Sequence, residues 1–327
     1  MIITKTPFRI SFVGGGSDLE AFYAQHTGAV LSTSINKYMY ISSHKFFDKT
    51  KIRTKYSQTE TVDTVEQLKH PILRTVLNHF DIKGGIEVSS IADVPSGTGM
   101  GSSSSFTVGV LHNLSAAVNQ YYSKDQLASQ ACKVEIDILK EPIGKQDQYA
   151  AAFGGLNTIE FLSNGHTRVT PIQMDPMAYS QLQENLLMFY VGNQRKASDI
   201  LAEQKKNTSQ QDKFDSLKKM VGLVYDLKDS FENSRIDDMG AILHENWLLK
   251  QALASGITNS TISEIYKTGL AHGATGGKLL GAGGGGFMLF YCPKEKQNQL
   301  KNALSHLQHF EFSFEQDGSK LIYYGDE

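Results

Sequence analysis

The chain has 327 residues, of which 40% are hydrophobic and 20% are charged, a balance that is ordinary for globular proteins. At about 150 residues per domain, this length fits two domains or one large one. The 32 Lys and Arg residues nearly balance the 34 Asp and Glu residues. No strong overall field therefore favours nucleic acid or an anionic membrane.

The sequence gives no sign of a segment that would direct the chain to a membrane. No apolar run approaches the ~18 residues that span a bilayer, and the N-terminus lacks the long apolar core of a signal peptide. Cys132 and Cys292 are too few for a disulfide framework and offer no metal-binding spacing with histidine. We therefore expect a soluble cytoplasmic protein that binds neither nucleic acid nor membranes, and we leave open whether it forms a homodimer.

The first part of the chain is predicted to form strands. Residues 9–13 and 38–41 are rich in β-branched and aromatic side chains, which favour strands. Residues 14–18, Gly-Gly-Gly-Ser-Asp, lie between them and predict a turn. Residues 85–91 alternate between apolar and polar, which is typical of a half-buried strand.

Three helices are predicted next along the chain. The first follows a serine run, and its apolar residues recur at three- and four-residue steps. These residues are Val110, Leu111, Leu114, Val118 and Tyr121. The second helix begins with a capping box of Ser123 and Gln126. Its apolar stripe consists of Leu127, Ala131, Val134 and Ile138. Residues 147–153 predict a short third helix that ends at Gly154.

The second half of the chain is predicted to begin near residue 166. Residues 186–191 form a predicted strand, a basic loop follows, and residues 211–253 are mostly helical. Asp317 and Gly318 lie between two apolar runs and predict a hairpin. Because strands and helices are mixed rather than strictly alternating, the fold class that we predict is α+β.

Residues 95–105 carry the strongest chemical signal. They follow a predicted strand, contain glycine at every second position from 97 to 101, and continue into four serines at the start of a helix. Glycines let the backbone approach a phosphate closely, and the N–H groups and dipole of the helix favour an anion. The loop lacks the lysine of a Walker A motif. A flexible surface loop is the alternative, and the serines at the mouth of an apolar helix count against it.

Residues 281–286, Gly-Ala-Gly-Gly-Gly-Gly, form a second glycine cluster that leads into a strand predicted at 287–291. The cluster satisfies GxGxxG formally, but it precedes a strand instead of opening a helix and lacks an acidic partner about 20 residues later. We therefore reject a dinucleotide-binding interpretation. A tight loop that packs against another backbone or a ligand fits better.

Two acidic residues have the chemistry that a kinase needs. Glu135 lies near the inner face of its predicted helix, and Asp147 begins the next helix. A kinase needs one carboxylate to hold Mg²⁺ and usually another to accept the proton of the substrate hydroxyl. From spacing alone the simpler alternative is favoured, in which Glu135 is solvated and Asp147 caps its helix.

Three segments, in the same order, resemble the GHMP small-molecule kinases, which include galactokinase, homoserine kinase and mevalonate kinase. Residues 95–105 resemble the phosphate loop of that family. Glu135 together with residues 142–148 resembles its metal-binding and catalytic segment, and residues 278–287 resemble its C-terminal glycine motif.

The resemblance implies a two-domain fold with the site in the cleft between the domains. An N-terminal α/β domain would cover residues 1–165, and a ferredoxin-like C-terminal domain would cover residues 166–327. The implied phosphate donor is ATP, and the implied metal is Mg²⁺.

The same resemblance assigns roles to individual residues. Asp147 would orient or deprotonate the acceptor hydroxyl, and Arg9 would stabilise Asp147 and the phosphoryl group. Ser103 and Glu135 would hold Mg²⁺. The triphosphate of ATP would bind along the loop and the helix start, at Pro95, Gly97, Gly99, Met100, Gly101, Ser102, Ser103 and Ser104.

Within the family the sequence is most similar to the sugar kinases. Arg9 and Asp18 stand nine residues apart, as an Arg and a sugar-binding Asp do in galactokinases. A Glu-His pair of galactokinases is replaced here by two glycines, and residues 7–19 look more like kinases of D-glycero-D-manno-heptose 7-phosphate and of L-fucose. The implied substrate site consists of Asp18, Gly15, Gly16, Ser17 and Gly284.

A sugar phosphate would bring a second phosphate into the site, and cations would be needed to bind it. Arg195 and Lys196 in the basic loop are the main candidates, and Lys250 is a weaker one. A solvated basic loop is the alternative. The resemblance thus implies an ATP- and Mg²⁺-dependent kinase that phosphorylates C1 of a heptose 7-phosphate. A kinase for an unphosphorylated sugar such as L-fucose and a non-catalytic sugar or nucleotide sensor are the alternatives.

Overall fold

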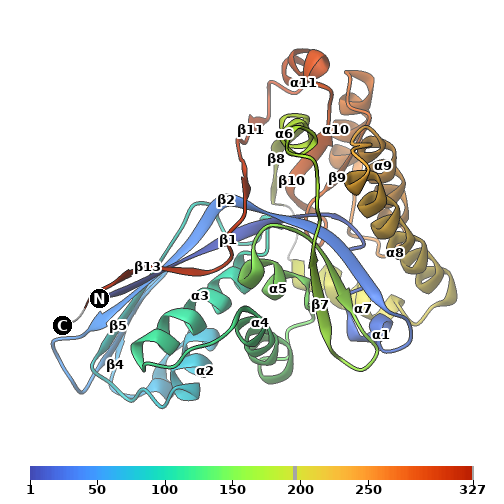
Figure 1. Cartoon of the computed structure of the whole chain (residues 1–327). Coiled ribbons are helices and arrows are strands. Elements are labelled where there is room, and N and C mark those ends of the chain that lie inside the picture. The colour runs from blue at the N-terminus through green and yellow to red at the C-terminus, as the bar shows by residue number, and fades with distance from the viewer. Residues whose placement is uncertain (194–196, 326–327) are drawn as a thin grey trace.

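The computed structural model describes residues 1–193 and 197–325 of the chain. Within these residues the strands form two sheets, one with nine strands and one with four. In Figure 1 the two long strands of the larger sheet cross the middle of the molecule, with one group of helices below them and another group to the right. Helices and mixed sheets together confirm the predicted α+β class.

The larger sheet has the strand order β13-β1-β2-β5-β3-β4, and it also contains β6, β7 and β12. Its strands are β1 (Ile2–Val13), β2 (Gly28–Lys45), β3 (Ile52–Lys55), β4 (Thr59–Val62), β5 (Ile86–Ala92), β6 (Leu156–Phe161), β7 (Thr167–Pro171), β12 (Phe314–Glu315) and β13 (Lys320–Tyr324). The pair β3 and β5 is parallel, whereas β1 and β2 are antiparallel. The strands predicted at 9–13 and 38–41 are confirmed as parts of β1 and β2. The strand predicted at 85–91 is confirmed as β5, which begins one residue later, at Ile86.

β1 is covered on both of its faces over much of its length. It is buried without interruption from Thr6 to Val13, because helices of the first half of the chain pack on it and helices of the second half also contact it. A strand buried on both faces normally carries apolar side chains throughout. The polar Arg9 and Ser11 in this stretch therefore mark the place where β1 reaches a functional site.

The helices of the first half are α1 (Glu20–Tyr23), α2 (Pro71–His79), α3 (Ser102–Ala117), α4 (Lys124–Cys132) and α5 (Gln146–Phe153), with a 3-10 turn at Val65–Gln67. The helix predicted after the serine run is confirmed as α3, but it is shorter than predicted. Asn119 has a φ of 57°, a left-handed conformation that ends helices. Val118 and Tyr121 therefore lie beyond the helix, and Tyr121 is 86% exposed.

The predicted capping box at the start of α4 is confirmed. The Ser123 hydroxyl accepts a hydrogen bond from the backbone N–H of Gln126, and the Gln126 side chain accepts one from the backbone N–H of Ser123. The helix then widens into a π-helix, Lys133–Ile138. This wider turn breaks the 3.6-residue spacing, so Ile138 is exposed although the apolar stripe placed it inside.

The smaller sheet has the order β11-β8-β10-β9 and is antiparallel. Its strands are β8 (Leu186–Asn193), β9 (Gly276–Leu279), β10 (Gly285–Tyr291) and β11 (Gln308–His309). The accompanying helices are α6 (Pro176–Glu184), α7 (Ala197–Asn207), α8 (Gln211–Glu232), α9 (Asp238–Gln251), α10 (Ser260–Ala271) and α11 (Gln297–Ala303), with a 3-10 turn at Lys294–Lys296. The succession of one strand, helices, two strands, a helix and a strand is that of the predicted ferredoxin-like domain.

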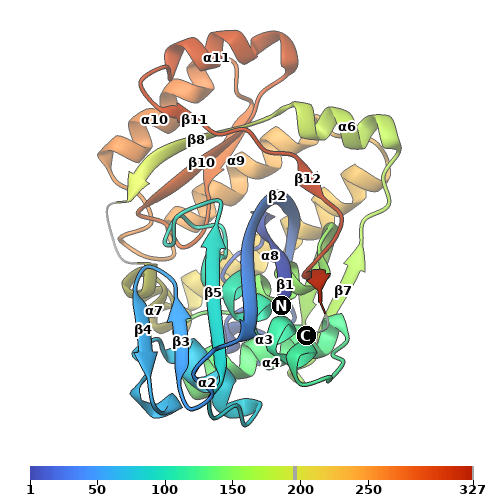
Figure 2. The ribbon, with the colours of Figure 1, turned by 90° about the vertical axis from the view of Figure 1, so that its left-hand side faces the viewer.

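The end of the described chain returns to the larger sheet, and the predicted hairpin at Asp317 and Gly318 is wrong. β12 pairs with β2, and β13 pairs with β1, so the two strands do not pair with each other. Gly318 instead carries the chain across the end of α5, where a Cβ would lie 2.1 Å from the Ala152 carbonyl oxygen. In Figure 2 the red segment with β12 runs down from the smaller sheet.

The predicted division of the chain after residue 165 stays a prediction. β7 follows that boundary and pairs with β6, and β12 and β13 also belong to the larger sheet. We therefore propose that the second domain is an insertion between β7 and β12 rather than the whole of residues 166–327.

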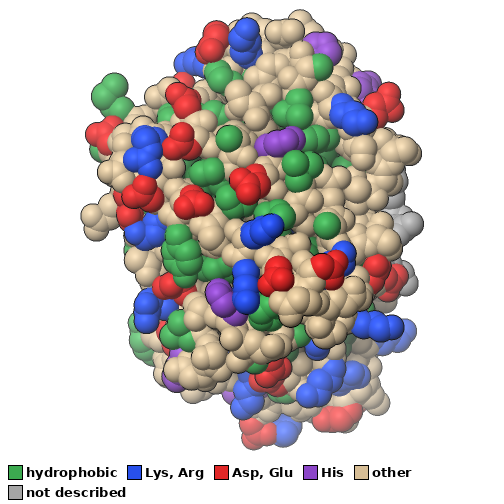
Figure 3. Space-filling model, turned by 90° about the vertical axis from the view of Figure 1, so that its right-hand side faces the viewer, with side chains coloured by type: hydrophobic (Ala, Val, Ile, Leu, Met, Phe, Trp, Pro, Cys, Tyr) green, Lys and Arg blue, Asp and Glu red, His purple; other side chains and the backbone are tan. Residues whose placement is uncertain are grey.

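On the face drawn in Figure 3, acidic and basic side chains are interspersed, and the described residues form no extended region of one charge there. This distribution agrees with the net charge of −2. No helix in the described part of the chain is both long and apolar enough to cross a membrane.

The packing of α10 on the smaller sheet depends on a glycine. A Cβ at Gly269 would lie 2.3 Å from a ring carbon of Phe290. We expect Gly269→Ala to lower the free energy of unfolding by about 1–3 kcal/mol, because the buried ring must shift. Urea unfolding measures the change. Gly222→Ala in α8 is the matched control, because nothing lies within 4 Å of its Cβ position. Equal effects of the two substitutions would contradict this account.

Candidate active site

A cleft is lined by residues from both halves of the chain. β1, the turn that follows it and α5 provide one side, and α7, α9 and the segment that follows β9 provide the other. The lining residues are Arg9, Ser11, Gly15, Gly16, Asp18, Leu19, Ile143, Gly144, Gln146, Asp147, Leu201, Gln204, Lys250, Lys278, Gly281 and Ala282. Of the predicted site residues, the cleft therefore brings together Arg9, Gly15, Gly16, Asp18 and Asp147.

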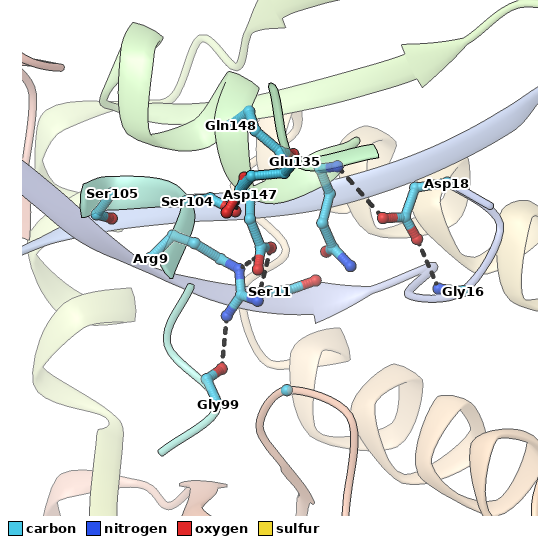
Figure 4. Close-up of polar contacts among 12 residues, drawn as sticks. Arg9, Ser11, Gly16, Asp18, Gly99, Ser104, Ser105, Glu135, Asp147 and Gln148 are labelled. Atoms are coloured by element: carbon cyan, nitrogen blue, oxygen red, sulfur yellow. Dashed lines mark hydrogen bonds and ion pairs between the residues drawn. The ribbon is translucent and has the colours of Figure 1, made fainter. Parts of the chain in front are cut away.

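Arg9 and Asp147 form an ion pair in this cleft. The Arg9 Nε and Nη2 atoms lie 2.7 Å and 2.6 Å from Asp147 Oδ1. The remaining Arg9 nitrogen, Nη1, donates to the Gly99 carbonyl at 2.7 Å. Figure 4 shows the guanidinium between these two partners. The Arg9 side chain is 4% exposed and that of Asp147 is 24% exposed, so the carboxylate is held in a fixed orientation while it stays accessible from the cleft.

The glycine loop leads directly into α3. Gly97, Gly99 and Gly101 all have positive φ values, and Gly101 occupies the N-cap position, with no side chain capping the helix. The first N–H groups of a helix have no partner within it, so this end of α3 is suited to bind an anion. A Cβ at Gly101 would lie 3.2 Å from Asp147 Oδ2, so the loop is next to the ion pair.

Other predicted loop residues hold this shape. The backbone N–H of Arg9 donates to the Met100 carbonyl at 3.2 Å. The Thr98 hydroxyl donates to the Pro95 carbonyl at 3.0 Å. Ser102 is the first residue of α3. The loop is therefore tied to β1 by backbone and side-chain contacts.

The two glycine clusters pack against each other. A Cβ at Gly281 would lie 2.3 Å from the Gly99 Cα, and one at Gly286 would lie 2.3 Å from the Thr98 carbonyl oxygen. The expectation that the second cluster packs against another backbone is confirmed. The backbone N–H of Gly284 donates to the Ile257 carbonyl at 3.1 Å. Gly284, a predicted substrate residue, is not among the described residues that line the cleft.

Glu135 is buried beside the start of α3, where it is 1% exposed. Its Oε1 accepts from the Ser103 hydroxyl at 2.9 Å, and its Oε2 accepts from the Ser104 hydroxyl at 2.8 Å and from the Gln148 amide at 2.7 Å. Burial raises the pKa of Glu135, and these hydrogen bonds oppose the shift. The alternative that Glu135 is solvated is wrong, because the π-helix turns it toward α3.

Glu135 and Ser103 together offer hard oxygen donors, the ligand type that Mg²⁺ prefers. In the described ranges no three His, Cys, Asp or Glu side chains are grouped so that they could hold a metal. Mg²⁺ in kinases commonly takes only one or two protein oxygens and completes its shell with phosphate and water. The two residues therefore fit a Mg²⁺ ion that arrives with a nucleotide.

Asp18 lies at the other side of the cleft, where it is 3% exposed. Its Oδ1 accepts from the Gly16 N–H at 3.0 Å, and its Oδ2 accepts from the Gln146 N–H at 3.2 Å. Burial and then the nearby charge of Asp147 raise the pKa of Asp18. The Ser17 hydroxyl, by contrast, donates to the carbonyls of Gly14 and Ala29 and supports the turn from inside.

Sequence reasoning missed several polar residues of the cleft. Ser11 Oγ, Gln146 Oε1 and Gln204 Nε2 are buried atoms without a hydrogen-bond partner in the described part of the chain, and all three residues line the cleft. Buried polar atoms are normally paired, so these three are available to a polar ligand. Arg195 and Lys196, the predicted phosphate contacts, lie outside the described residues.

A fixed Arg–carboxylate pair beside a helix N-terminus suits proteins that move a phosphoryl group, and comparison with known proteins agrees. Residues 65–155 match the N-terminal domain of the GHMP kinases, and residues 227–308 match their C-terminal domain. The chain belongs to the GHMP kinase family, as its resemblance predicted, and it is a phosphotransferase with an alcohol group as acceptor.

Particular relatives cover almost the whole chain. The D-glycero-alpha-D-manno-heptose 7-phosphate kinase of Campylobacter jejuni is 29% identical over 98% of this chain and 98% of its own length. The bifunctional fucokinase/GDP-fucose pyrophosphorylase of Arabidopsis thaliana is 27% identical over 94% of this chain and 31% of its own length. A crystal structure of a D-glycero-D-manno-heptose 1-phosphate kinase from Bacteroides thetaiotaomicron superposes with a TM-score of 0.82, 21% identity and 100% coverage of both chains, which shows the same fold.

The contact between the two glycine clusters can be tested at Gly99. It has a φ of +84°, and a Cβ would lie 2.6 Å from the Leu280 carbonyl oxygen. Gly165 has the same φ of +84° with nothing within 4 Å of its Cβ position. Gly165→Ala should therefore cost only the left-handed backbone term, about 1–2 kcal/mol.

We expect Gly99→Ala to lower the free energy of unfolding by about 1–3 kcal/mol more than Gly165→Ala does, because the backbones at Gly99 and Leu280 must move apart. Urea unfolding of both variants gives the comparison. Equal losses of stability would show that the two glycine clusters do not constrain each other.

Proposed function

We propose that this chain is a sugar kinase that transfers the γ-phosphoryl group of ATP, with Mg²⁺, to the anomeric hydroxyl of D-glycero-α-D-manno-heptose 7-phosphate, which gives the 1,7-bisphosphate. The observation that carries this proposal is the ion pair of Arg9 and Asp147, which lies against the glycine loop in the same cleft as Asp18. The identity to the Campylobacter jejuni heptose 7-phosphate kinase over nearly the full length of both chains supports the choice of sugar.

The glycine loop and the start of α3 are the proposed polyphosphate site. Residues 97–104 present backbone N–H groups at a helix N-terminus with no acidic side chain in its first turn, which favours negative charge there. Ser103 Oγ and Glu135 Oε1 lie 2.9 Å apart, and we assign them as the protein ligands of Mg²⁺. The metal, when bound, supplies charge that offsets that of the phosphates.

Asp147 is proposed to receive the proton of the acceptor hydroxyl. As the acceptor oxygen bonds to phosphorus and the bond to the ADP oxygen breaks, this proton passes to the carboxylate. Phosphoryl transfer has a loose transition state, so alignment and charge neutralisation matter more than a strong base. An anomeric hydroxyl is more acidic than an ordinary alcohol, so a carboxylate suffices. Arg9 holds Asp147 in place and adds positive charge.

The polar wall of the cleft is proposed to bind the sugar. Asp18 offers carboxylate oxygens, and the unpartnered atoms of Ser11, Gln146 and Gln204 offer both donors and acceptors. A ligand rich in hydroxyl groups would satisfy all of them. Such polar sites discriminate strongly, because a ligand that lacks one hydroxyl leaves a buried group unpaired. Arg195 and Lys196 stay candidates for the sugar phosphate.

The acceptor can be identified with a panel of sugars tested with and without a terminal phosphate, with NMR used to locate the new phosphate. We expect D-glycero-α-D-manno-heptose 7-phosphate to have the highest kcat/KM, and the product to be phosphorylated at C1. L-Fucose is the informative competitor, since the Arabidopsis relative with fucokinase in its name is 27% identical to this chain. A preference for L-fucose would replace the proposed substrate, and no turnover with any sugar would favour a sensor.

The role of Asp147 predicts a specific kinetic defect. Asp147→Asn keeps the size of the side chain but removes the proton acceptor, so kcat should fall by about 10²–10⁴-fold. Binding of ATP, measured by calorimetry, should change only a few-fold, because the phosphate loop does not depend on that proton. Asp81→Asn, at an exposed surface position, is the control. Wild-type turnover by Asp147→Asn would overturn the mechanism.

A further inference from the structure

Two lysines of the cleft have buried side chains and only backbone partners. Lys250 at the end of α9 is 5% exposed, and its ammonium donates to the Gly281 carbonyl. Lys278 of β9 is 1% exposed and donates to the carbonyls of Ser11 and Phe12, both at 2.8 Å. An ammonium has three donors. Within the described chain, two donors of the Lys250 ammonium therefore lack a hydrogen-bond partner.

Lys250 has no ion-pair partner of its own among the described residues of the cleft. The charged groups that face it are Arg9 from β1, Asp18 from the turn after β1, Asp147 from α5 and Lys278 from β9. Asp147 is already paired with Arg9. Among the described residues, no carboxylate oxygen lies within 4.0 Å of either lysine nitrogen. Burial, and then the charges of Lys250 and Arg9, lower the pKa of Lys278 well below its usual value. Lys250 is thus a buried cation next to an arginine, and without an acidic partner of its own it is costly unless a ligand supplies the negative charge.

The pKa of Lys250 reflects this environment. Burial and then the charge of Arg9 lower it to about 8, although the two carboxylates oppose the shift. Lys250 is therefore largely protonated at neutral pH and loses its charge as the pH rises through about 8. A guanidinium at this position would keep its charge over the whole range.

This inference rests on the proposed function. We infer that Lys250 binds a phosphate oxygen of the ligand in the cleft, and that it thereby strengthens either the binding of a phosphorylated acceptor or the stabilisation of the transition state. Lys278 acts as a positioning residue, since it fixes the end of β1 through Ser11 and Phe12. The phosphate oxygen has two sources: the acceptor's own phosphate or the phosphoryl group in transfer. Lys250 touches Gly281, which packs on Gly99 of the phosphate loop, and it also lines the cleft with Asp18. The position of Lys250 is therefore compatible with either source of the phosphate oxygen.

Kinetics of Lys250→Met separate the two sources. If Lys250 binds the acceptor's phosphate, KM for the heptose 7-phosphate should rise ~10–100-fold while kcat and the kinetics of the unphosphorylated heptose barely change. If it binds the phosphoryl group in transfer, kcat should fall by about the same factor for both acceptors. Lys267→Met, which removes an exposed lysine of α10, is the control. Unchanged constants in Lys250→Met would overturn the inference.

The pH profile gives a readout that a structural role would not change. In the wild type, kcat/KM should fall as the pH rises through about 8, because Lys250 then loses the charge that attracts the anion. Lys250→Arg should keep its kcat/KM to higher pH. The same decline in both proteins would assign the pKa to another group and count against Lys250.

A binding measurement without turnover separates this inference from the proposed function. Inorganic phosphate should raise the melting temperature of the wild type at pH 7 more than that of Lys250→Met. A smaller shift in Lys250→Met supports the anion site even if the wild type fails to phosphorylate the heptose, in which case only the proposed function fails. Equal shifts would overturn the anion site. Lys250→Arg keeps the positive charge. If the missing charge alone explains the smaller shift of Lys250→Met, phosphate should raise the melting temperature of Lys250→Arg about as much as that of the wild type.

Discussion

The three contacts of the Arg9 guanidinium are the constraint on which the rest of the site depends. Arg9 is fixed by a strand that is buried on both faces, and it joins Asp147 of α5 to the Gly99 carbonyl of the glycine loop. A buried charge is tolerated only when it is paired and hydrogen-bonded. The same three contacts that offset the cost of burying the Arg9 charge therefore also place the Asp147 carboxylate at the edge of the phosphate loop.

Backbone packing provides a second constraint. The glycine loop is held from one side by β1 and from the other by the glycine cluster after β9, at distances that leave no room for side chains. The cluster also accepts the Lys250 ammonium at Gly281. At the two glycine clusters the domains thus meet through main-chain atoms, and the residues that line the cleft come from both domains.

The sequence was sufficient for features that depend on local pattern, such as the serine run that opens α3 and the Ser123 capping box. It failed where the outcome depends on distant partners. Asp317 and Gly318 look like a hairpin turn locally, but the strands beside them pair with β1 and β2. Lysines are almost never fully buried, so no local pattern predicts that Lys250 is. The family resemblance led to Glu135, which spacing alone would have left in solvent.

The pairing of β13 with β1 has a consequence for synthesis. β1 and β2 are made early, but the outer edge of β1 at Ile2–Lys5 is not covered until the ribosome has made residues 320–324. Until then the nascent chain carries an open strand edge, which can pair with other chains. Closing a loop of this length is also slow. The first residues of β1 therefore complete their pairing only after nearly all of the described chain has been made.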